Sequence, residues 1–196
     1  INSRISIDIP DYLENLPNLI IYGPPASGKY CESLKIIEKF SPSHLKYEKK
    51  LIVNFHKNSH IIKISDIHYE INLENLTCNS KLLFNEIYSN ILDSIETSIN
   101  KQGIILYKNF HYIDNELLDV FYSYMQKIIN NNKIIKNIIL TEHICLISKN
   151  ILNVCHILNI QKLSISNYIK LANDENKKII KNFNNFEKNN FLNTIN

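Results

Sequence analysis

The chain reads NLIIYGPPASGKY from Asn18 to Tyr30, and this stretch decides the fold. The apolar run Leu19–Tyr22 predicts a buried strand. The turn that follows matches G-x-x-x-x-G-K from Gly23 to Lys29, and a helix-forming stretch comes next. A strand, this loop and a helix in that order are typical of a phosphate-binding loop.

In such a loop the backbone N–H groups wrap the phosphates, and the following helix adds its positive N-terminal end. Glycine permits the close turns that a Cβ would obstruct, and the lysine reaches the terminal phosphates as a point charge. A chance match on a tight strand-to-helix turn is the alternative. The preceding buried strand favours the phosphate loop, and we expect nucleotide contacts from Gly23, Pro24, Pro25, Ala26, Ser27, Gly28, Lys29 and Tyr30.

The residues that should hold Mg²⁺ are missing. A serine or threonine should follow the loop lysine, and Tyr30 stands there. A second buried strand should end in acidic residues. The matching strand, Gly103–Tyr107, ends in Lys108-Asn109 instead. We therefore expect ATP or ADP as the ligand, a poorly held Mg²⁺, no catalytic or metal-binding residues, and no efficient ATP hydrolysis by this chain alone.

Two interpretations of Lys108 follow from its place after that strand. Its ammonium could face the pocket and replace part of the charge of Mg²⁺, or it could point into solvent, which is the commoner fate of a lysine. Asp114 and Glu116 lie too far downstream for the strand tip. They suit the start of the next helix, where negative charge is stabilising.

The remaining periodicity alternates strands with helices. Strands are predicted over 51–55, 61–64, 67–73, 103–107, 134–141 and 158–163, and helices over 28–40, 80–99 and 115–130. The first two of these strands read as a hairpin within residues 51–64. Such alternation predicts a three-layer α/β fold, in which helices cover both faces of a parallel sheet. The phosphate site then lies at the carboxyl end of the first strand.

Composition sets broad limits. The 196 residues, 44% of them hydrophobic, can build one sizeable domain. A net charge of +3 permits contact with nucleic acid without indicating it. The four cysteines form no C-x-x-C pair, so free thiols in a reducing compartment inside the cell are expected. No membrane-spanning or secretory segment is evident. The abundance of Ile, Asn and Lys suits an AT-rich genome, such as that of a large DNA virus or a parasite.

Other conspicuous side chains have structural explanations. His56, His60 and His68 suit a hairpin turn and a strand better than a metal site, which needs converging ligands. An aromatic series could stack on bases, but half of it falls on the inward face of a predicted helix and favours core packing. The series comprises Phe110, Tyr112, Phe121, Tyr122 and Tyr124.

Several segments together resemble one family. Leu16–Pro25, LPNLIIYGPP, is close to the LPHLLFYGPP of replication factor C small subunits, the AAA+ clamp loaders. The hairpin followed by Ile67–Ile71 resembles a subunit type with an inserted hairpin. Asn137–Glu142 matches the first sensor strand, and Ile147–Cys155, ISKNILNVC, stands where the family has IPPIRSRC.

This resemblance implies an AAA+ domain over 1–163 and a partial helical lid or C-terminal tail over 164–196. It implies a role in DNA replication, with Thr141 as the sensor. The partners would be other clamp-loader subunits, the sliding clamp and primer-template DNA, and no membrane would be involved. The protein would act in the nucleus, or in the cytoplasm or a virus factory if the source is viral. Asn153-Val154-Cys155 lacks the trans-acting arginine of the family, and losing such a group costs about 10³–10⁵ in rate.

Two rival functions stay open at this point. The chain could be a small P-loop ATPase or kinase whose acidic residues come from elsewhere, such as Asp66 or Asp114. It could also be an interaction module that keeps the fold without the ligand.

Overall fold

The computed structural model describes residues 8–55, 58–76, 80–127 and 133–162. They belong to a compact unit over 1–160, apart from Gln161 and Lys162, which begin a second unit over 161–196. The predicted lid or tail at 164–196 lies outside the described residues, so the domain boundary at 163 stays a prediction.

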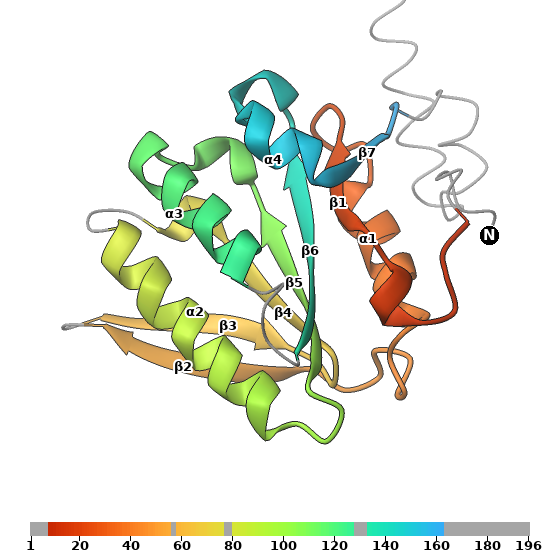
Figure 1. The fold of residues 1–196 in the computed structure, drawn as a ribbon, viewed down its shortest axis with the longest axis vertical. Helices are drawn as coiled ribbons and strands as arrows, with labels where there is room; N and C mark the ends of the chain where they lie inside the picture. Colours follow the sequence, from red (N-terminus) through yellow and green to blue (C-terminus); the bar gives the residue numbers. More distant parts are fainter. Residues whose placement is uncertain (1–7, 56–57, 77–79, 128–132, 163–196) are drawn as a thin grey trace, which may run out of the picture. The chain divides into compact units, whose positions relative to one another are not determined.

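Seven strands form one sheet in the order β2-β3-β4-β5-β6-β1-β7. Five neighbours, from β4 to β7 in that order, pair in parallel, whereas β2 and β3 form an antiparallel hairpin that joins β4 at the sheet edge (Figure 1). The strands are β1 (Asn18–Tyr22), β2 (Lys49–Phe55), β3 (Asn58–Ile64), β4 (His68–Asn72), β5 (Gln102–Lys108), β6 (Ile134–Thr141) and β7 (Cys155–Asn159).

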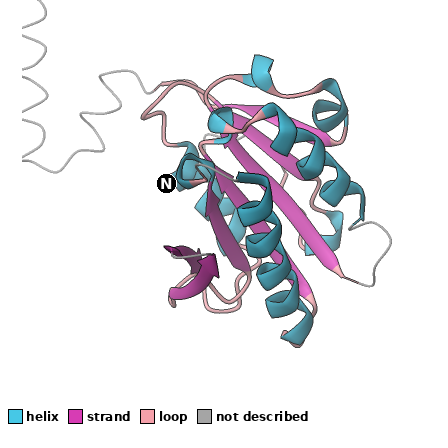
Figure 2. Ribbon diagram, turned by 90° about the vertical axis from the view of Figure 1, so that its left-hand side faces the viewer, coloured by secondary structure: helices cyan, strands magenta, loops and turns pink. Residues whose placement is uncertain are grey.

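Helices cover both faces of this sheet (Figure 2). They are α1 (Lys29–Glu38), α2 (Ser80–Thr97), α3 (Asn115–Lys127) and the short α4 (Lys149–Asn153), with 3₁₀ turns η1 (Leu13–Asn15), η2 (Leu73–Asn75), η3 (Phe110–Tyr112) and η5 (Ile144–Leu146). None of the helices in the described ranges has the length and hydropathy to span a membrane.

The alternation of side chains along β1 produces the layers. Leu19 and Ile21 join one buried cluster with Ile36 of α1, while Ile20 joins the cluster that α2 and α3 cover. Successive side chains of a strand point to opposite faces, so one apolar run serves both layers. The three-layer α/β fold predicted from the sequence is confirmed.

Two local predictions are wrong. The last strand begins at Cys155 rather than at residue 158, because α4 ends at Asn153 and pairing with β1 starts at once, with Cys155 opposite Asn18. In the predicted helix over 80–99, the spacing of apolar residues places Leu82 on the same inward face as Leu83, but Leu82 is 58% exposed. The buried stripe of α2 instead runs through Leu83, Phe84 and the positions one to three turns further, which are Ile87, Tyr88, Ile91 and Ile95.

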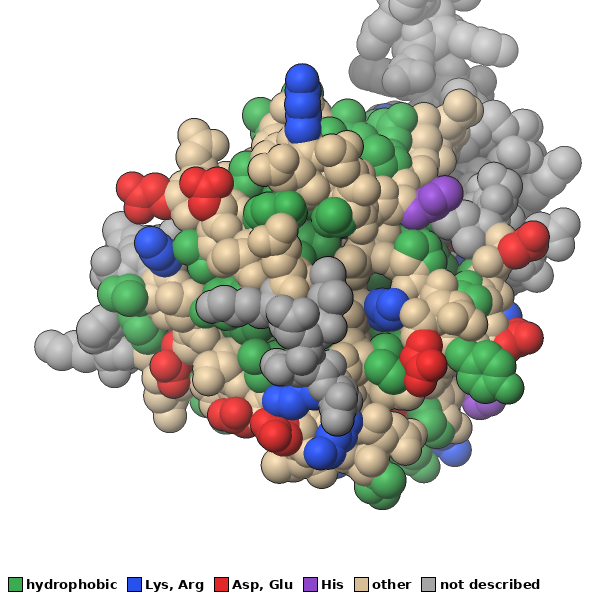
Figure 3. Space-filling view, in the orientation of Figure 1, with side chains coloured by type: hydrophobic (Ala, Val, Ile, Leu, Met, Phe, Trp, Pro, Cys, Tyr) green, Lys and Arg blue, Asp and Glu red, His purple; other side chains and the backbone are tan. Residues whose placement is uncertain are grey.

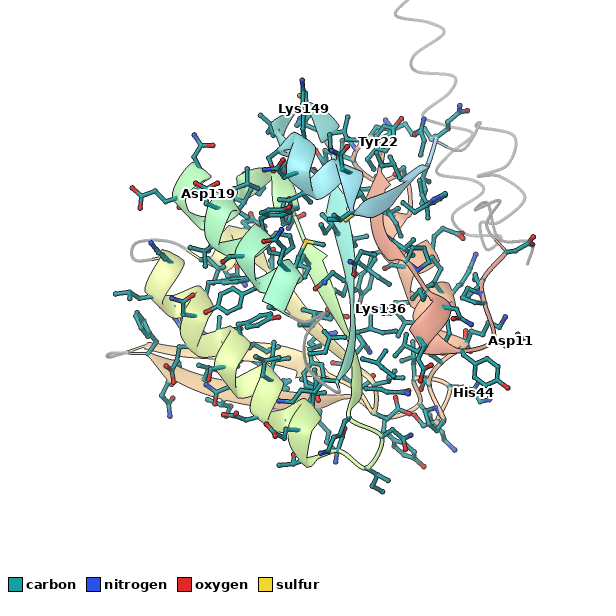
Figure 4. All side chains as sticks on the ribbon, viewed as in Figure 1. Asp11, Tyr22, His44, Asp119, Lys136 and Lys149 are labelled. Atoms are coloured by element: carbon teal, nitrogen blue, oxygen red, sulfur yellow. The ribbon has the colours of Figure 1, made fainter. Side chains whose placement is uncertain are left out.

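The parallel strands bring distant segments to one edge. The loop after β1 and the ends of β5 and β6 meet where the strand arrows point, in the upper part of Figure 1. Figure 4 labels Tyr22, the last residue of β1, near this edge and Lys136 further down β6. Ligands of open parallel sheets bind at this carboxyl edge.

Phe121 packs α3 onto the sheet, with its ring centroid 4.8 Å from that of Tyr107 and 5.0 Å from that of Phe110, in edge-on contacts. Phe121→Ala should therefore lower the free energy of unfolding by about 3–5 kcal/mol, because it leaves a cavity. The measurement is urea denaturation followed by circular dichroism. Tyr112, 57% exposed, gives the control: Tyr112→Ala should cost less than about 0.5 kcal/mol. Equal losses in both variants would contradict this packing.

Candidate nucleotide-binding site

The loop after β1 has a defined backbone path. Its start is tied to β6 by a hydrogen bond from the Gly23 N–H to the Thr141 carbonyl oxygen, at 3.3 Å. Gly28 has φ 87°, in the left-handed region that glycine adopts without strain. The first hydrogen bond of α1 joins the Glu32 N–H to the Gly28 carbonyl oxygen. The helix amides that precede Glu32 therefore point toward the loop, as in an anion site.

Gly23 is required for a reason that the motif does not reveal. A Cβ at this position would lie 2.2 Å from the carbonyl oxygen of Ile160. The chain after β7 runs against the loop, and the Ile160 N–H donates to the Tyr22 carbonyl oxygen at 2.8 Å. The loop is thus wedged between β6 and the segment after β7.

A pocket of about 280 Å³ opens beside the loop. Its size suits the phosphate part of a nucleotide. The predicted sensor Thr141 lines this pocket, while Gly23, Pro24 and Pro25 of the predicted contacts do not. The lining residues are Ala26, Ser27, Gly28, Lys29, Tyr30, Lys108, Asn109, His111, Leu140, Thr141 and Glu142.

The Lys29 side chain folds back and binds the backbone of its own loop. Its Nζ donates to the carbonyl oxygens of Gly23 at 2.8 Å and Pro24 at 2.9 Å, and lies 4.0 Å from Glu142 Oε1. Burial lowers the pKa of Lys29, and the Glu142 charge partly offsets this. The lysine therefore binds the carbonyl groups of the loop and leaves the inward-pointing amides to other partners.

A buried carboxylate joins the two residues that replace the expected metal ligands. Tyr30 donates its hydroxyl to Glu70 Oε1 at 2.6 Å, and Lys108 Nζ donates to Glu70 Oε2 at 3.2 Å. The Lys108 ammonium also lies 4.8 Å from the centroid of the Tyr30 ring. Lys108 thus faces the pocket, and the solvent-pointing interpretation is wrong.

His68 and Ser65 form a chain of hydrogen bonds that ends at Glu70. His68 Nε2 lies 3.4 Å from Glu70 Oε1, and His68 Nδ1 lies 2.5 Å from the Ser65 hydroxyl. Burial alone would raise the pKa of Glu70, but the bonds from His68 and Tyr30 and the Lys108 charge outweigh it and lower the pKa to about 2. Glu70 is therefore ionised at neutral pH although its side chain is only 5% exposed.

Sequence reasoning missed Glu70. The available signal was a lone acidic residue inside the apolar strand predicted over 67–73, since carboxylates are rarely buried unless paired. The partner could not be identified, because Tyr30 and Glu70 are 40 residues apart and meet only through the fold.

The two positions that usually hold Mg²⁺ beside a phosphate loop do not fit it here, because Mg²⁺ binds hard oxygen ligands. The Tyr30 hydroxyl is directed at Glu70, and the Lys108 charge occupies the end of β5. Asp66 precedes β4 at the opposite edge and accepts hydrogen bonds from Ser41, while Asp114 does not line the pocket. Among the described residues, no three His, Cys, Asp or Glu side chains gather as metal ligands.

Solved structures of other proteins superpose on this chain. C. elegans PCH-2 superposes with TM-score 0.50 at 11% identity, over 79% of this chain and 37% of that one. A chain of the E. coli MS115-1 HORMA:CdnC:Trip13 complex superposes with TM-score 0.50 at 11% identity, over 84% and 55%. No protein-family model matches the sequence, and no curated protein sequence matches it.

These similarities show the fold alone, which is the three-layer α/β fold of the P-loop NTPase (AAA+) type. The chain spans about a third to a half of the length of those two structures. At 11% identity these structures establish no role, so the resemblance to clamp loaders stays a prediction.

Glu70→Gln should remove the stabilisation that the ionised carboxylate provides. Because the pKa is lowered on folding, from 4.5 to about 2, this stabilisation is complete above pH 4.5 and disappears as the pH falls through about 2. We expect a loss of about 3 kcal/mol at pH 7, which narrows toward zero near pH 2. Urea denaturation at several pH values measures the difference.

The exposed carboxylate of Glu48 provides the matched control for this pH series. Glu48→Gln should change the free energy of unfolding by less than about 1 kcal/mol at any pH. A Glu70→Gln loss that does not vary with pH would contradict an ionised Glu70.

Proposed function

We propose that this chain is a clamp-loader-like AAA+ subunit that binds ATP or ADP at residues 23–30 and hydrolyses it poorly. One observation carries the nucleotide part. The glycine-rich loop lies at the carboxyl end of strand β1, between β6 and β7 in the sheet, and the first amides of α1 point into it. An array of this kind binds phosphate through the backbone.

Lys29 would exchange partners when nucleotide binds. Its Nζ, now donating to the carbonyl oxygens of Gly23 and Pro24, would donate to phosphate oxygens instead. Charge-assisted bonds of this kind are stronger than bonds to neutral carbonyl groups. Glu142, 4.0 Å from Lys29, opposes phosphate through its negative charge, so the pocket depends on its cations and amides.

Thr141 is our proposed sensor of the bound nucleotide. It ends β6, its side chain is fully buried, and it lines the pocket. Its hydroxyl now donates to the His143 carbonyl oxygen at 3.1 Å. A contact with nucleotide would require this hydroxyl to turn away from His143.

Hydrolysis lacks its usual groups. The pocket offers no carboxylate at the end of β5, where Lys108 stands. Asn153 ends α4 and Cys155 begins β7, so the expected position of the trans-acting arginine carries no cation. These absences support binding without turnover by the chain alone.

The clamp-loader role rests on the order and spacing of the family-like segments. We propose other clamp-loader subunits, the sliding clamp and primer-template DNA as partners, in a reducing compartment inside the cell. In Figure 3 the basic and acidic side chains of the visible face are interspersed, without a continuous basic patch among the described residues. This arrangement favours contact with DNA through the assembly over binding by this face alone.

Lys29→Ala should weaken ADP and ATP binding about 10–100-fold, the loss expected when charge-assisted hydrogen bonds are removed. Isothermal titration calorimetry on the purified chain measures it. The control is Lys39→Ala, at the residue that follows α1, where the lysine pairs with Asp11 at 3.0 Å. That variant should bind like the native chain.

One structural observation favours the rival, a module without a ligand: the Lys29 ammonium already satisfies itself on loop carbonyl groups. Failure of the native chain to bind either nucleotide at millimolar concentration would support that rival and contradict the nucleotide site.

Affinity purification of the tagged chain from its own cells should recover identified clamp-loader subunits and the sliding clamp, as detected by mass spectrometry. A tagged unrelated protein of similar charge serves as the control. Recovery of neither partner, from cells in which both are expressed, would contradict the clamp-loader role and leave nucleotide binding untouched.

A further inference from the structure

We propose that Lys108 takes the place of the divalent cation, so that nucleotide binds to this pocket without Mg²⁺. The inference rests on the proposed nucleotide site and adds how its phosphate charge is neutralised. It concerns nucleoside di- and triphosphates, whose clustered negative charge otherwise calls for a metal ion.

The Lys108 ammonium group lies at the pocket beside the phosphate loop. Lys108 is the last residue of β5, at the carboxyl edge where the loop after β1 also lies. Its side chain is 31% exposed and lines the same pocket as Gly28, Lys29 and Tyr30. The pocket therefore offers two ammonium groups to one ligand, Lys29 from the start of α1 and Lys108 from the end of β5.

Lys108 is held by Glu70 and Tyr30. Glu70 Oε2 accepts one of its N–H groups at 3.2 Å, and the face of the Tyr30 ring lies beneath the ammonium, 4.8 Å from the ring centroid. An ammonium has three donors, so two remain for phosphate oxygens. The contacts to Glu70 and Tyr30 orient the lysine before any ligand arrives, which reduces the entropy lost on binding.

A metal ion is disfavoured in the space beside Glu70 and Lys108. Glu70 Oε1 already accepts from Tyr30 at 2.6 Å and from His68 at 3.4 Å. A divalent cation would have to displace these bonds and approach the Lys108 charge at short range, which costs energy. The substitutions of Tyr30 and Lys108 thus act together: one removes a metal ligand, and the other supplies a cation.

The test is calorimetric titration of the full chain with ADP and with ATP, once with excess EDTA and once with MgCl₂. The expected dissociation constants agree within about threefold between the two conditions, and Lys108→Met weakens binding about tenfold in EDTA. Lys133→Met is the matched control, since Lys133 precedes β6 at the opposite edge and pairs with Glu96. That variant should bind like the native chain.

A second variant tests whether Lys108→Met weakens binding only because it disturbs the fold. Lys108→Met leaves the Glu70 charge without its cation, so Lys108→Met combined with Glu70→Gln removes both charges. Thermal melting establishes that each variant is folded. The double variant should show the same weakening in EDTA as the single one.

The outcomes separate the two proposals. Binding that requires Mg²⁺, or that is unchanged in folded Lys108 variants, overturns this inference, while loss of binding in Lys29→Ala still supports the nucleotide site. Absence of binding by the native chain in both conditions overturns the nucleotide site, and the inference with it.

Discussion

The buried carboxylate of Glu70 determines what this pocket can hold. It lies in the middle of β4, and its two oxygens accept hydrogen bonds from Tyr30 and Lys108. Without this carboxylate, Lys108 would lose its ion-pair partner and the Tyr30 hydroxyl its acceptor. A buried ion pair is weak evidence for stability, so its value here is in holding one ammonium at the pocket. The chemistry of the site follows from this arrangement.

A second constraint comes from the parallel sheet. Because β1, β5 and β6 run in the same direction, their carboxyl ends deliver the loop, Lys108 and Thr141 to one edge. The segment after β7 then packs against Gly23 so closely that no side chain fits. The backbone cradle is therefore rigid, while the identity of a few side chains decides whether a metal ion or an internal lysine balances the ligand charge.

Much of this could be predicted from the sequence, because the signals are local. The loop motif after an apolar run located the site, and the twofold and 3.6-residue periodicities located most strands and helices. The absence of an acidic residue after Tyr107 already pointed to an unusual pocket. Local signals failed where tertiary pairing decides, as for the start of β7 and for the exposed Leu82.

The Glu70 network could not be predicted for the same reason. Its members come from α1, β4 and β5, and they meet through the register of neighbouring strands, in which Glu70 lies opposite Leu106 and Asn72 opposite Lys108. No single stretch of sequence contains that register. The consequence of Tyr30 was likewise hidden, because its hydroxyl finds a partner 40 residues away.

The most direct measurement is a crystal structure of the chain grown with ADP and MnCl₂, with diffraction data recorded at an energy where manganese scatters anomalously. We expect phosphate density against the amides of Gly28–Tyr30, with Lys108 Nζ within hydrogen-bond distance of a phosphate oxygen and no anomalous peak beside it. A manganese peak bound to the phosphates, with Lys108 turned away from them, would show that a metal ion and not Lys108 balances the phosphate charge.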